Sequence, residues 1–414
     1  MKIKIGVVGC GAFASQFVPL FRDHPMVEKV AVCDMLRDRA DSYSKLYGIK
    51  DVYYSYEDLL KSDVNCIAVF SQRHLHGPMV LAALDAGKHV CSAVPTASSL
   101  EDIQKIVEKV ESTGLTYGLL ETSYYYASTI FCRKKFKDGL MGKFVYGEAR
   151  YCHDMDHFYA SFQRSGGENW KQVAGIPPMY YPTHSVSMIT SVTGAKVKKV
   201  SCSGFVDSHE DAIFRKGANL WDNIFSNQTA LMYTSDGGSC VINEFRRIGY
   251  TSRKNSVYQS LFGTEGVYEQ GASGCTWMEL KKDIVDDVTE FLNCCDSSSG
   301  DLNFIDSGLS ESLKRDFVTR EAQVHNRARL PESFSKHRNG HFGSHQFLVD
   351  DFVKAVHADK LPPNHVWAAA DYCAPGLVAH ESAKKDGLLI DVPDFGSPPA
   401  GKSFLNPDEG YVWA

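Results

Sequence analysis

The glycine-rich start of the chain constrains its fold more than any other stretch. An apolar run, Lys4–Val8, ends at Gly9 and Gly11, and a helix-like run begins at Phe13. A dinucleotide-binding fingerprint requires this strand–turn–helix order, because Gly9 makes the tight turn and Gly11 lets the backbone approach a pyrophosphate. Ala14 takes the third small position, where the helix packs on the strand. An α/β turn without a ligand is the alternative.

Asp34 supplies the acidic residue that accompanies such a fingerprint. It follows Ala14 by twenty residues and ends the next apolar run, where a carboxylate binds the ribose 2′-hydroxyl of adenosine. A 2′-phosphate would meet this carboxylate, so Asp34 favours NAD over NADP, while nearby Arg37 leaves NADP open. The residues expected to hold this end of NAD are Gly9, Gly11, Ala12, Phe13, Ala14 and Asp34.

Strand and helix patterns alternate up to about residue 121. The apolar strand candidates are Lys4–Val8, Lys29–Cys33, Cys66–Phe70, His89–Ser92 and Thr116–Leu120. This alternation predicts βαβ units and an α/β fold with a doubly wound parallel sheet. Because 414 residues are too many for one ordinary core, we expect a Rossmann domain at residues 1–122 and a second domain at 123–414.

The second domain is expected to be α+β, with a large, mostly antiparallel open sheet. Its strand candidates are longer and are separated by turn signals; they are Phe144–Cys152, Lys198–Phe205, Thr229–Thr234, Gly238–Phe245 and Val257–Phe262. A polar stretch at about 281–338 lacks periodicity and is predicted to be an insertion. Helices are predicted within residues 344–385, at Ser344–His357 and Val366–Lys385.

Two loops are expected at the nicotinamide end of the cofactor, because ligands of doubly wound sheets bind at the carboxyl ends of the strands. They follow the third and fourth strand candidates, and Glu121 follows the fifth. The cofactor contacts expected there are Ser71, Gln72, His74, His76, Val94, Pro95 and Glu121, with substrate as the alternative partner of Glu121. No third ligand accompanies His74 and His76, so no metal site is predicted.

The charge balance and the cysteines limit the classes of partner and the compartment that we expect for this protein. The 44 basic and 50 acidic residues give a net charge of −6 without a basic block, which argues against nucleic acid. No apolar run approaches membrane-spanning length and no secretory signal is visible, so no membrane is expected as a partner. Twelve scattered cysteines without a Cys-x-x-Cys pair fit a reducing cytoplasm.

The glycine turn, the block Ser71–His76 and the run Ala82–Pro95 together resemble the glucose–fructose oxidoreductase/inositol dehydrogenase (Gfo/Idh/MocA) family. The resemblance covers essentially the whole chain. It implies a nicotinamide-binding domain followed by an open-sheet domain, with a sugar or polyol substrate between them. It also implies a homo-oligomer formed through the second-domain sheet.

Two departures from the dehydrogenases of this family concern the catalytic residues. Those enzymes carry Glu-Lys-Pro where this chain has Ala93-Val94-Pro95, and their lysine assists removal of the substrate hydroxyl proton. Valine can neither donate nor accept a proton. The dehydrogenases also place an aspartate four residues before the second-domain histidine, where this chain has Tyr180.

Other local matches resemble glycoside hydrolase family 109 and related NAD-dependent glycosidases, which share the fold but keep the cofactor bound. They are the Val94-Pro95 pair, the segment Tyr181-Pro182-Thr183-His184, and Gly147-Glu148 followed by Tyr151 and His153. This resemblance implies a nicotinamide cofactor that is recycled on the enzyme.

Tyr181 and His184 are the candidate bases that replace the missing lysine. A base must remove the hydroxyl proton as hydride leaves a carbinol carbon, and these residues lie three apart at a proline-started helix N-terminus, where an anion is favoured. If carbon 3 of a glycoside becomes a ketone, the carbon 2 proton becomes acidic and the carbon 1 substituent can leave. Water then adds and the hydride returns. We assign the carbon 2 proton to Tyr181 and the carbon 3 hydroxyl to His184; interdomain packing is the alternative for both.

Sugar contacts are expected from Tyr125, Glu148, Tyr151 and His153. Core packing is the alternative for Tyr125, and a solvated strand face is the alternative for Glu148 and His153. Three functions are compatible with these residues. The first is a glycosidase with internal redox, the second is a sugar dehydrogenase or ketoreductase with net NAD(H) turnover, and the third is a non-enzymatic NAD-binding sensor.

Overall fold

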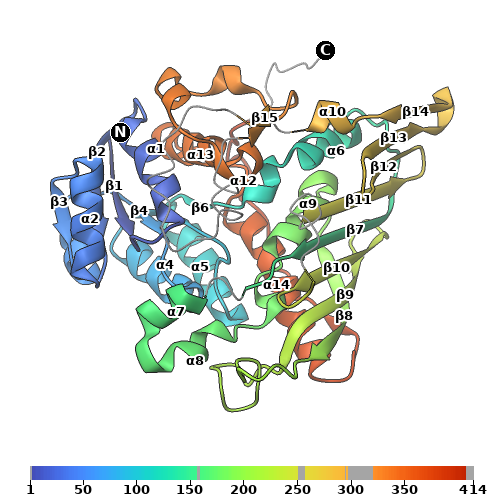
Figure 1. Cartoon of the computed structure of the whole chain (residues 1–414). Helices are drawn as coiled ribbons and strands as arrows, with labels where there is room; N and C mark the ends of the chain where they lie inside the picture. Colours follow the sequence, from blue (N-terminus) through green and yellow to red (C-terminus); the bar gives the residue numbers. More distant parts are fainter. Residues whose placement is uncertain (1, 156–158, 250–256, 294, 297–319, 407–414) are drawn as a thin grey trace. The chain divides into compact units, whose positions relative to one another are not determined.

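The computed structural model of the protein describes residues 2–155, 159–249, 257–293, 295–296 and 320–406 (Figure 1). The chain divides into two compact units. The first unit comprises Met1–Ala127, Asn293–Ala370 and Phe395–Ala414, and the second comprises Ser128–Leu292 and Asp371–Asp394.

A six-stranded sheet forms the core of the first unit. Its strand order is β3-β2-β1-β4-β5-β6, and all neighbouring strands are parallel. The strands are β1 (Ile3–Val8), β2 (Val27–Cys33), β3 (Asp51–Tyr53), β4 (Cys66–Val69), β5 (His89–Ser92) and β6 (Tyr117–Leu119). The order reverses between β1 and β4, which makes the sheet doubly wound with its switch point at the carboxyl ends of these strands. The predicted Rossmann class is confirmed.

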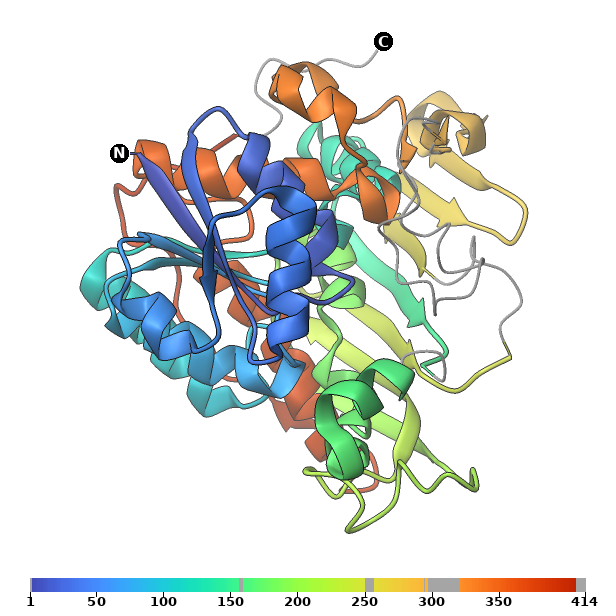
Figure 2. The same cartoon turned by 60° about the vertical axis from the view of Figure 1, so that its left-hand side comes forward.

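Helices connect these strands and cover both faces of the sheet (Figure 2). They are α1 (Val18–Asp23), α2 (Arg37–Tyr47), α3 (Tyr56–Lys61), α4 (His76–Asp85) and α5 (Leu100–Thr113). In α5 the buried residues are Ile103, Ile106, Val107 and Val110, the spacing of one apolar helix face. Ser99 caps its first turn by accepting from Asp102 N at 3.1 Å, and Gly114 ends it with φ +68°.

The chain after the glycine turn differs from the single helix expected from Phe13. A 3-10 turn, η1 (Ala14–Gln16), comes first, and α1 begins only at Val18. Pro19 lies in the first turn of α1. Because proline has no backbone N–H and is favoured at the start of a helix, the regular helix begins beside Pro19 rather than at the glycines.

Residues 320–370 also belong to the first unit. Their elements are β16 (Arg320–Glu321), which pairs with β15 (Cys295–Asp296), η11 (Arg327–Arg329), η12 (Glu332–Lys336), α12 (Gly340–Gly343) and α13 (His345–Ala358). Helix α13 packs on β1 and α1, since eleven of its residues from His345 to Val356 are buried. These compact units are assembled differently from the expected domains, whose boundary at residue 122 stays a prediction.

The second unit contains a nine-stranded sheet with the order β14-β13-β12-β11-β7-β10-β9-β8-β17. Only β7 and β10 pair in parallel, and the other neighbours are antiparallel, which confirms the expected mostly antiparallel sheet. The strands are β7 (Phe144–Cys152), β8 (Val197–Val206), β9 (Phe225–Thr234), β10 (Ser239–Phe245), β11 (Val257–Gly263), β12 (Gly266–Gln270), β13 (Cys275–Glu279), β14 (Ile284–Asp287) and β17 (Ile390–Asp391).

The helices of the second unit are α7 (Tyr159–Gly166), η5 (Gly167–Asn169), α8 (Trp170–Ala174), η6 (Pro178–Tyr180), α9 (Thr183–Thr193), η8 (Leu280–Lys282) and α10 (Thr289–Leu292). Two further helices, α6 (Ala127–Lys137) and α14 (Val366–Ala383), begin in one unit and end in the other. Helix α9 packs on β7, β10 and β11, so one face of the sheet is covered there.

The expected insertion at 281–338 is only partly described. Its start contributes β14, an edge strand that pairs with β13. This strand has two apolar residues followed by two aspartates and is mostly exposed, so it lacks the apolar alternation that predicts a strand. Residues 294 and 297–319 of the expected insertion lie outside the described residues. Within the described part of the chain, no helix is long and apolar enough to span a bilayer.

Candidate active site

The glycine turn at the end of β1 needs a glycine at position 9. Gly9 has φ +95°, and a Cβ built there would lie 2.6 Å from the Phe70 carbonyl oxygen. Any side chain would therefore meet both backbone strain and a clash. At Gly11 a Cβ would meet no atom within 4 Å. The backbone at Gly11 thus faces open space, as close approach of a pyrophosphate requires.

Asp34 is buried beside this turn at the carboxyl end of β2. Its Oδ2 accepts from the Cys10 backbone N–H at 2.8 Å, and its Oδ1 accepts from the Leu36 backbone N–H at 2.8 Å. These bonds fix the carboxylate but use only part of its capacity, since two oxygens offer about four lone-pair sites. Asp34 can therefore still accept from a ribose hydroxyl. Tyr43, from α2, donates its hydroxyl to the Gly11 carbonyl.

His76 joins the loops that follow β4 and β5. It is buried, with its Nδ1 2.7 Å from the Pro95 carbonyl oxygen and its Nε2 3.0 Å from the Ser71 carbonyl oxygen. Both ring nitrogens thus face backbone carbonyls of the protein. This geometry makes His76 a positioning residue that ties the two loops together, whereas Ser71, Gln72 and His74 are partly exposed at the end of β4.

The family lysine position carries a buried apolar side chain. Val94 is 5 % exposed and precedes Pro95 through a cis peptide bond. Glu121 follows β6 and is fully buried; its Oε1 accepts from the backbone N–H of Ser123 at 2.9 Å and from the hydroxyl of Ser123 at 2.8 Å. That carboxylate caps the 3-10 turn η3 (Thr122–Tyr125).

Tyr125 lies in the first unit within a buried ionic network. Its hydroxyl donates to Asp351 and accepts from Arg329 Nη2 at 3.0 Å. Arg329 Nη1 also donates to Asp350 at 3.0 Å and to Asp351 at 2.8 Å. The phenol is 2 % exposed. The structure therefore gives Tyr125 a buried packing environment within the first unit, whereas the other expected sugar contacts belong to the second unit, and its role as a sugar contact stays a prediction.

Four of the expected residues form one aromatic cluster in the second unit. Tyr151 is the second-last residue of β7, His153 directly follows the strand, Tyr181 precedes α9, and His184 lies in its first turn. The ring centroids of Tyr151 and His184 lie 4.9 Å apart, those of Tyr151 and His153 lie 5.3 Å apart, and those of Tyr181 and His184 lie 5.2 Å apart. His184 is 3 % exposed. Tyr181 and His184 lie three residues apart in the sequence, and their rings are in contact in the structure.

Glu148 is not part of this cluster. Successive side chains of a strand point to opposite faces, and Glu148 is three residues from Tyr151 on β7. It faces Tyr146, whose hydroxyl donates to Glu148 Oε1 at 2.9 Å. On the face of Tyr151, a Cβ at Gly147 would meet Ile189 of α9. The structure therefore places Glu148 on the sheet face away from α9.

Glu244 and Arg246 of the neighbouring strand complete the cluster, and sequence reasoning missed both. Glu244 pairs directly with Tyr151 across the sheet and is fully buried. It accepts from the Ser185 hydroxyl and from Arg246 Nη2, the latter at 2.5 Å. Burial raises the pKa of Glu244 to about 7, against the lowering effect of Arg246. The guanidinium of Arg246 lies 5.1 Å from the Tyr151 ring centroid and 5.6 Å from that of Tyr181.

The sequence of β10 contains a pattern that indicates the Glu244–Arg246 pair. Cys240 and Ile242 alternate as buried residues, and Glu244 continues the same period. A carboxylate at an inward position of a strand needs a partner, and Arg246 follows at the next inward position. The alternation therefore marks an ionic pair on the buried face. Strand pairing, which places the pair beside Tyr151, is not visible in the local sequence.

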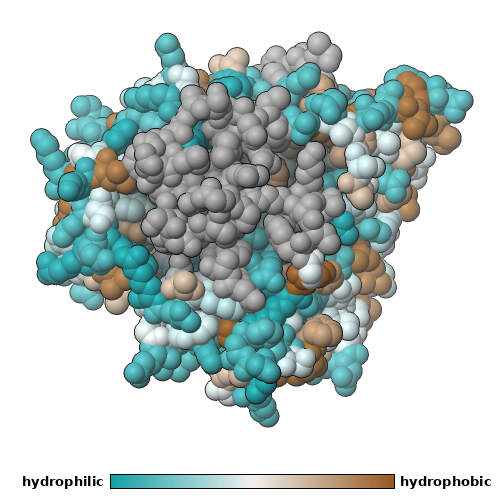
Figure 3. Space-filling view, viewed as in Figure 1, coloured by the Kyte–Doolittle hydropathy of each residue, from teal (hydrophilic) through white to brown (hydrophobic). Residues whose placement is uncertain are grey.

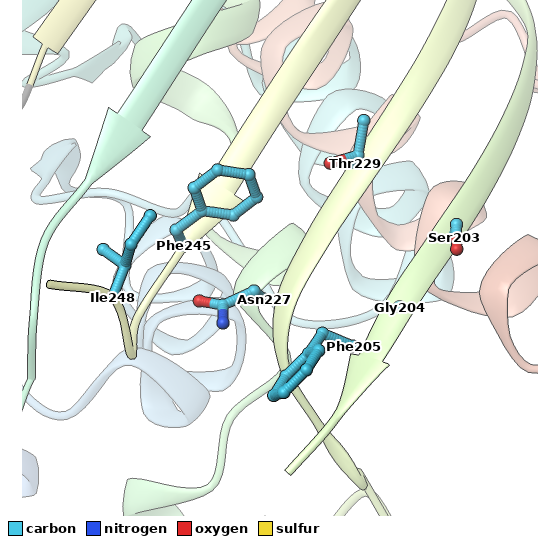
Figure 4. Close-up of a pocket in the computed structure, with 7 residues that line it drawn as sticks. All are labelled: Ser203, Gly204, Phe205, Asn227, Thr229, Phe245 and Ile248. Atoms are coloured by element: carbon cyan, nitrogen blue, oxygen red, sulfur yellow. The ribbon is translucent and has the colours of Figure 1, made fainter.

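A hollow of about 420 Å³ lies on the opposite face of the same sheet (Figure 4). Its lining residues are Ser203, Gly204, Phe205, Asn227, Thr229, Phe245 and Ile248. On β9 and β10 these alternate with Gln228 and Glu244, which point to the side of α9. The hollow is therefore separate from the aromatic cluster.

Comparison with known proteins agrees with this geometry. Residues 3–120 match the model of the oxidoreductase family with an NAD-binding Rossmann fold, Gfo/Idh/MocA. A glycosyl hydrolase family 109 protein of Saccharopolyspora erythraea is 26 % identical over 421 aligned positions, covering 95 % of this chain and 83 % of the relative.

Two solved structures share the fold. Scyllo-inositol dehydrogenase from Lactobacillus casei, with NAD(H) and scyllo-inositol, has a TM-score of 0.65 at 16 % identity and covers 94 % of this chain and 99 % of its own. Levoglucosan dehydrogenase, with NADH and levoglucosan, has a TM-score of 0.68 at 15 % identity and covers 95 % and 100 %. The expected cofactor, NAD, agrees with the family match, which also supports an enzyme. Within this chain, the segment 3–120 thus matches the NAD-binding Rossmann domain of the Gfo/Idh/MocA oxidoreductase family, and the chain as a whole shares the fold of the two dehydrogenases.

Proposed function

We propose that the protein is an NAD-dependent enzyme that cleaves a glycoside by internal redox. The observation that carries the proposal is the cluster of Tyr151, Tyr181 and His184 beside the buried Glu244–Arg246 pair. It brings together two side chains that can exchange protons, Tyr181 and His184, and the cation of Arg246. The position of the family lysine carries an apolar side chain, Val94. The family 109 name of a relative that covers most of the chain supports the same choice.

The proposed roles divide between the two units. In the first unit, Gly9, Gly11 and Asp34 hold NAD, together with the neighbouring turn residues Ala12, Phe13 and Ala14. The part-exposed loop residues Ser71, Gln72 and His74 border its nicotinamide end. When bound, NAD supplies an acceptor for hydride from sugar carbon 3 and returns that hydride at the end of the cycle. In the second unit, Tyr151 and His153 contact the sugar.

His184 is proposed to take the proton of the carbon 3 hydroxyl as the carbonyl forms. Tyr181 then removes the carbon 2 proton, and the bond between carbon 1 and the leaving group breaks. Water then adds at carbon 1 and its proton goes to the departed leaving group, while Tyr181 returns its proton to carbon 2. As hydride returns to carbon 3, His184 returns its proton to the carbon 3 oxygen, which restores both residues. Arg246 supports the second step, because a cation 5.6 Å from the Tyr181 ring centroid favours the phenolate, which is the form of Tyr181 that can accept the carbon 2 proton.

The test uses aryl glycosides and the full chain without added cofactor. We expect release of the aryl alcohol, NAD bound in stoichiometric amount and no accumulation of NADH. Tyr181→Phe should slow hydrolysis and carbon 2 proton exchange with solvent together, by about 10²- to 10⁴-fold. Loss of hydrolysis with exchange intact would contradict the role given to Tyr181.

A sugar dehydrogenase is the second candidate, favoured by the fold shared with levoglucosan and scyllo-inositol dehydrogenases. In that case turnover would require added NAD and would proceed in step with NADH formation. The same assay therefore separates the two reactions. Tyr146→Phe is a matched control, because its hydroxyl contacts Glu148 on the other sheet face and its loss should leave catalysis unchanged.

A further inference from the structure

The segment Gly340–Gly343 of the first unit has an unusual backbone. His341 has φ +47° and ψ +63°, Phe342 has φ +55° and ψ +39°, and Gly343 has φ +85°. Three successive residues are thus left-handed, and two of them carry a Cβ, which this conformation disfavours. Strain of this kind persists only where the surroundings enforce it, and it concentrates at functional sites.

Buried contacts hold the turn in this shape. The Gly343 N–H donates to the Asn339 carbonyl at 3.1 Å, and the fully buried Asn339 side chain accepts from the Gln346 N–H at 2.9 Å. A Cβ at Gly340 would lie 2.8 Å from Cε1 of His345. Gly340 therefore makes room for the imidazole of His345, and the strained turn is part of the folded core.

The turn brings two histidines together. His345 Nε2 lies 2.9 Å from His341 Nδ1, and the His345 ring is fully buried. Within the described structure, Nδ1 of His345 has no hydrogen-bond partner. Since a buried N–H without an acceptor is rarer than an unused lone pair, the hydrogen of His345 belongs on Nε2. Burial keeps this ring neutral by lowering the pKa of His345 well below its ordinary value.

This tautomer determines that of His341. If His345 donates from Nε2, then Nδ1 of His341 accepts, and the hydrogen of a neutral His341 lies on Nε2. The hydrogen bond from His345 thus fixes the tautomer of His341. A histidine at a functional site is commonly oriented by a hydrogen bond to its second ring nitrogen. The pair thus carries its second N–H on Nε2 of His341, in a ring whose backbone is held by the strained turn.

The imidazole of His341 lies beside the glycine turn. Both imidazoles contact the Phe13 ring edge-to-face, with centroid distances of 5.4 Å for His341 and 5.6 Å for His345. Phe13 lies between Gly11 and Ala14, in the backbone that faces a pyrophosphate. No lysine or arginine occurs between Gly9 and Gln16, so the turn itself offers only backbone donors.

We propose that the turn Gly340–Gly343 is a second cofactor-binding segment, in which Nε2–H of His341 donates to a pyrophosphate oxygen of bound NAD. His345 is the positioning residue that sets the tautomer of His341. The inference rests on the cofactor and not on the glycoside reaction, so it can fail or hold whatever the substrate is.

The first test measures binding of NAD and of ADP-ribose to the full chain by calorimetry after removal of bound cofactor. His341→Phe keeps a ring beside Phe13 but has no N–H, and it should weaken both ligands equally, by about tenfold or more. His357→Phe, an exposed position on α13, is the matched control and should bind as the wild type does. Weakening of NAD alone would place the contact at the nicotinamide end and overturn the pyrophosphate assignment.

The second test does not depend on a variant that folds. Nitrogen-15 spectra of histidine-labelled wild-type protein should show His341 protonated at Nε2, with that signal shifted by saturating ADP-ribose. His345→Phe should mix the tautomers of His341 and weaken ADP-ribose less than His341→Phe does. An unshifted His341 signal on binding, or a His341 protonated at Nδ1, would overturn the proposal.

Discussion

At the scale of single residues, Glu244 is where burial and charge pairing oppose each other most directly. Burial raises its pKa from 4.5 to about 7 although Arg246 favours the charged form. Between these values the folded protein holds a proton that the unfolded chain releases. The free energy of unfolding should therefore fall as pH rises through this window, by on the order of 3 kcal/mol for this group.

Glu244→Gln removes this titration, so its unfolding free energy should change less between pH 4.5 and 7.5 than that of the wild type. Urea denaturation at several pH values measures the difference in slope. Burial also raises the pKa of Asp371 to about 7. Because Asp371 titrates in both proteins, its contribution cancels in the difference between their slopes. The exposed Glu269→Gln on β12 is the control and should run parallel to the wild type. Parallel curves for Glu244→Gln would show that the carboxylate is charged at low pH.

The site residues that the sequence predicts are those that lie close together along the chain. Gly9, Gly11 and Asp34 share one strand–turn–helix unit and its following strand, so spacing alone relates them. Tyr181 and His184 were found for the same reason. Glu244 reaches Tyr151 only through the pairing of β10 with β7, and such pairing joins segments that are far apart in the sequence. His341 was missed as a left-handed residue because positive φ is unusual for any side chain other than glycine.

At the scale of elements, the approach of α14 to the turn before α9 decides where Tyr181 lies. A Cβ at Gly376 would lie 1.9 Å from the Met179 carbonyl oxygen and 2.2 Å from Cγ of Pro182. Neither the helix nor the turn can accommodate that atom in place. The close contact therefore positions the segment that carries Tyr181, and it requires the absence of a side chain.

Gly376→Ala should destabilise the protein by about 1–3 kcal/mol, because an extra methyl in a packed core forces backbone shifts. It should also lower kcat more than it raises KM in the glycoside assay, as Tyr181 is displaced from its contact with His184. Chemical denaturation and steady-state kinetics check the two effects. Gly271→Ala, where the nearest atom would lie 3.4 Å away, is the control. A Gly376→Ala variant with unchanged stability would show that α14 and the turn can separate without cost.

Element patterns were predictable where burial is periodic, and were missed where it is not. Strand β7 has the expected bounds, and helix α13 lies within one residue of the helix expected at Ser344–His357. The short β3 is only partly buried along its length, and the polar β14 is mostly exposed. Neither strand shows an apolar pattern, and each joins the edge of its sheet. Edge strands need less apolar surface, so hydrophobic periodicity cannot reveal them.

At the scale of the whole molecule, the sheet face opposite α9 carries several exposed apolar side chains. Its exposed side chains include Phe205 at 61 %, Leu231 at 37 %, Tyr233 at 42 % and Ile248 at 41 %. Figure 3 shows apolar side chains along the right-hand margin, where Figure 1 draws the strands of this sheet. Contiguous apolar surface of this kind marks an interaction site. We propose that this face pairs with a second copy of the chain, as the family resemblance implies.

Leu231→Lys places a charge on β9, an inner strand of that face, and should convert an oligomer into a monomer, since an unpaired charge cannot be buried at an interface without a large cost. Light scattering coupled to size exclusion measures the mass. Met35→Lys, on a highly exposed side chain of the first unit at 82 %, adds the same charge elsewhere and should keep the oligomer. NAD affinity should be unchanged in Leu231→Lys, because β9 contributes nothing to the glycine turn. A wild-type protein that runs as a monomer at micromolar concentration would contradict the pairing, and its apolar face would then need another occupant.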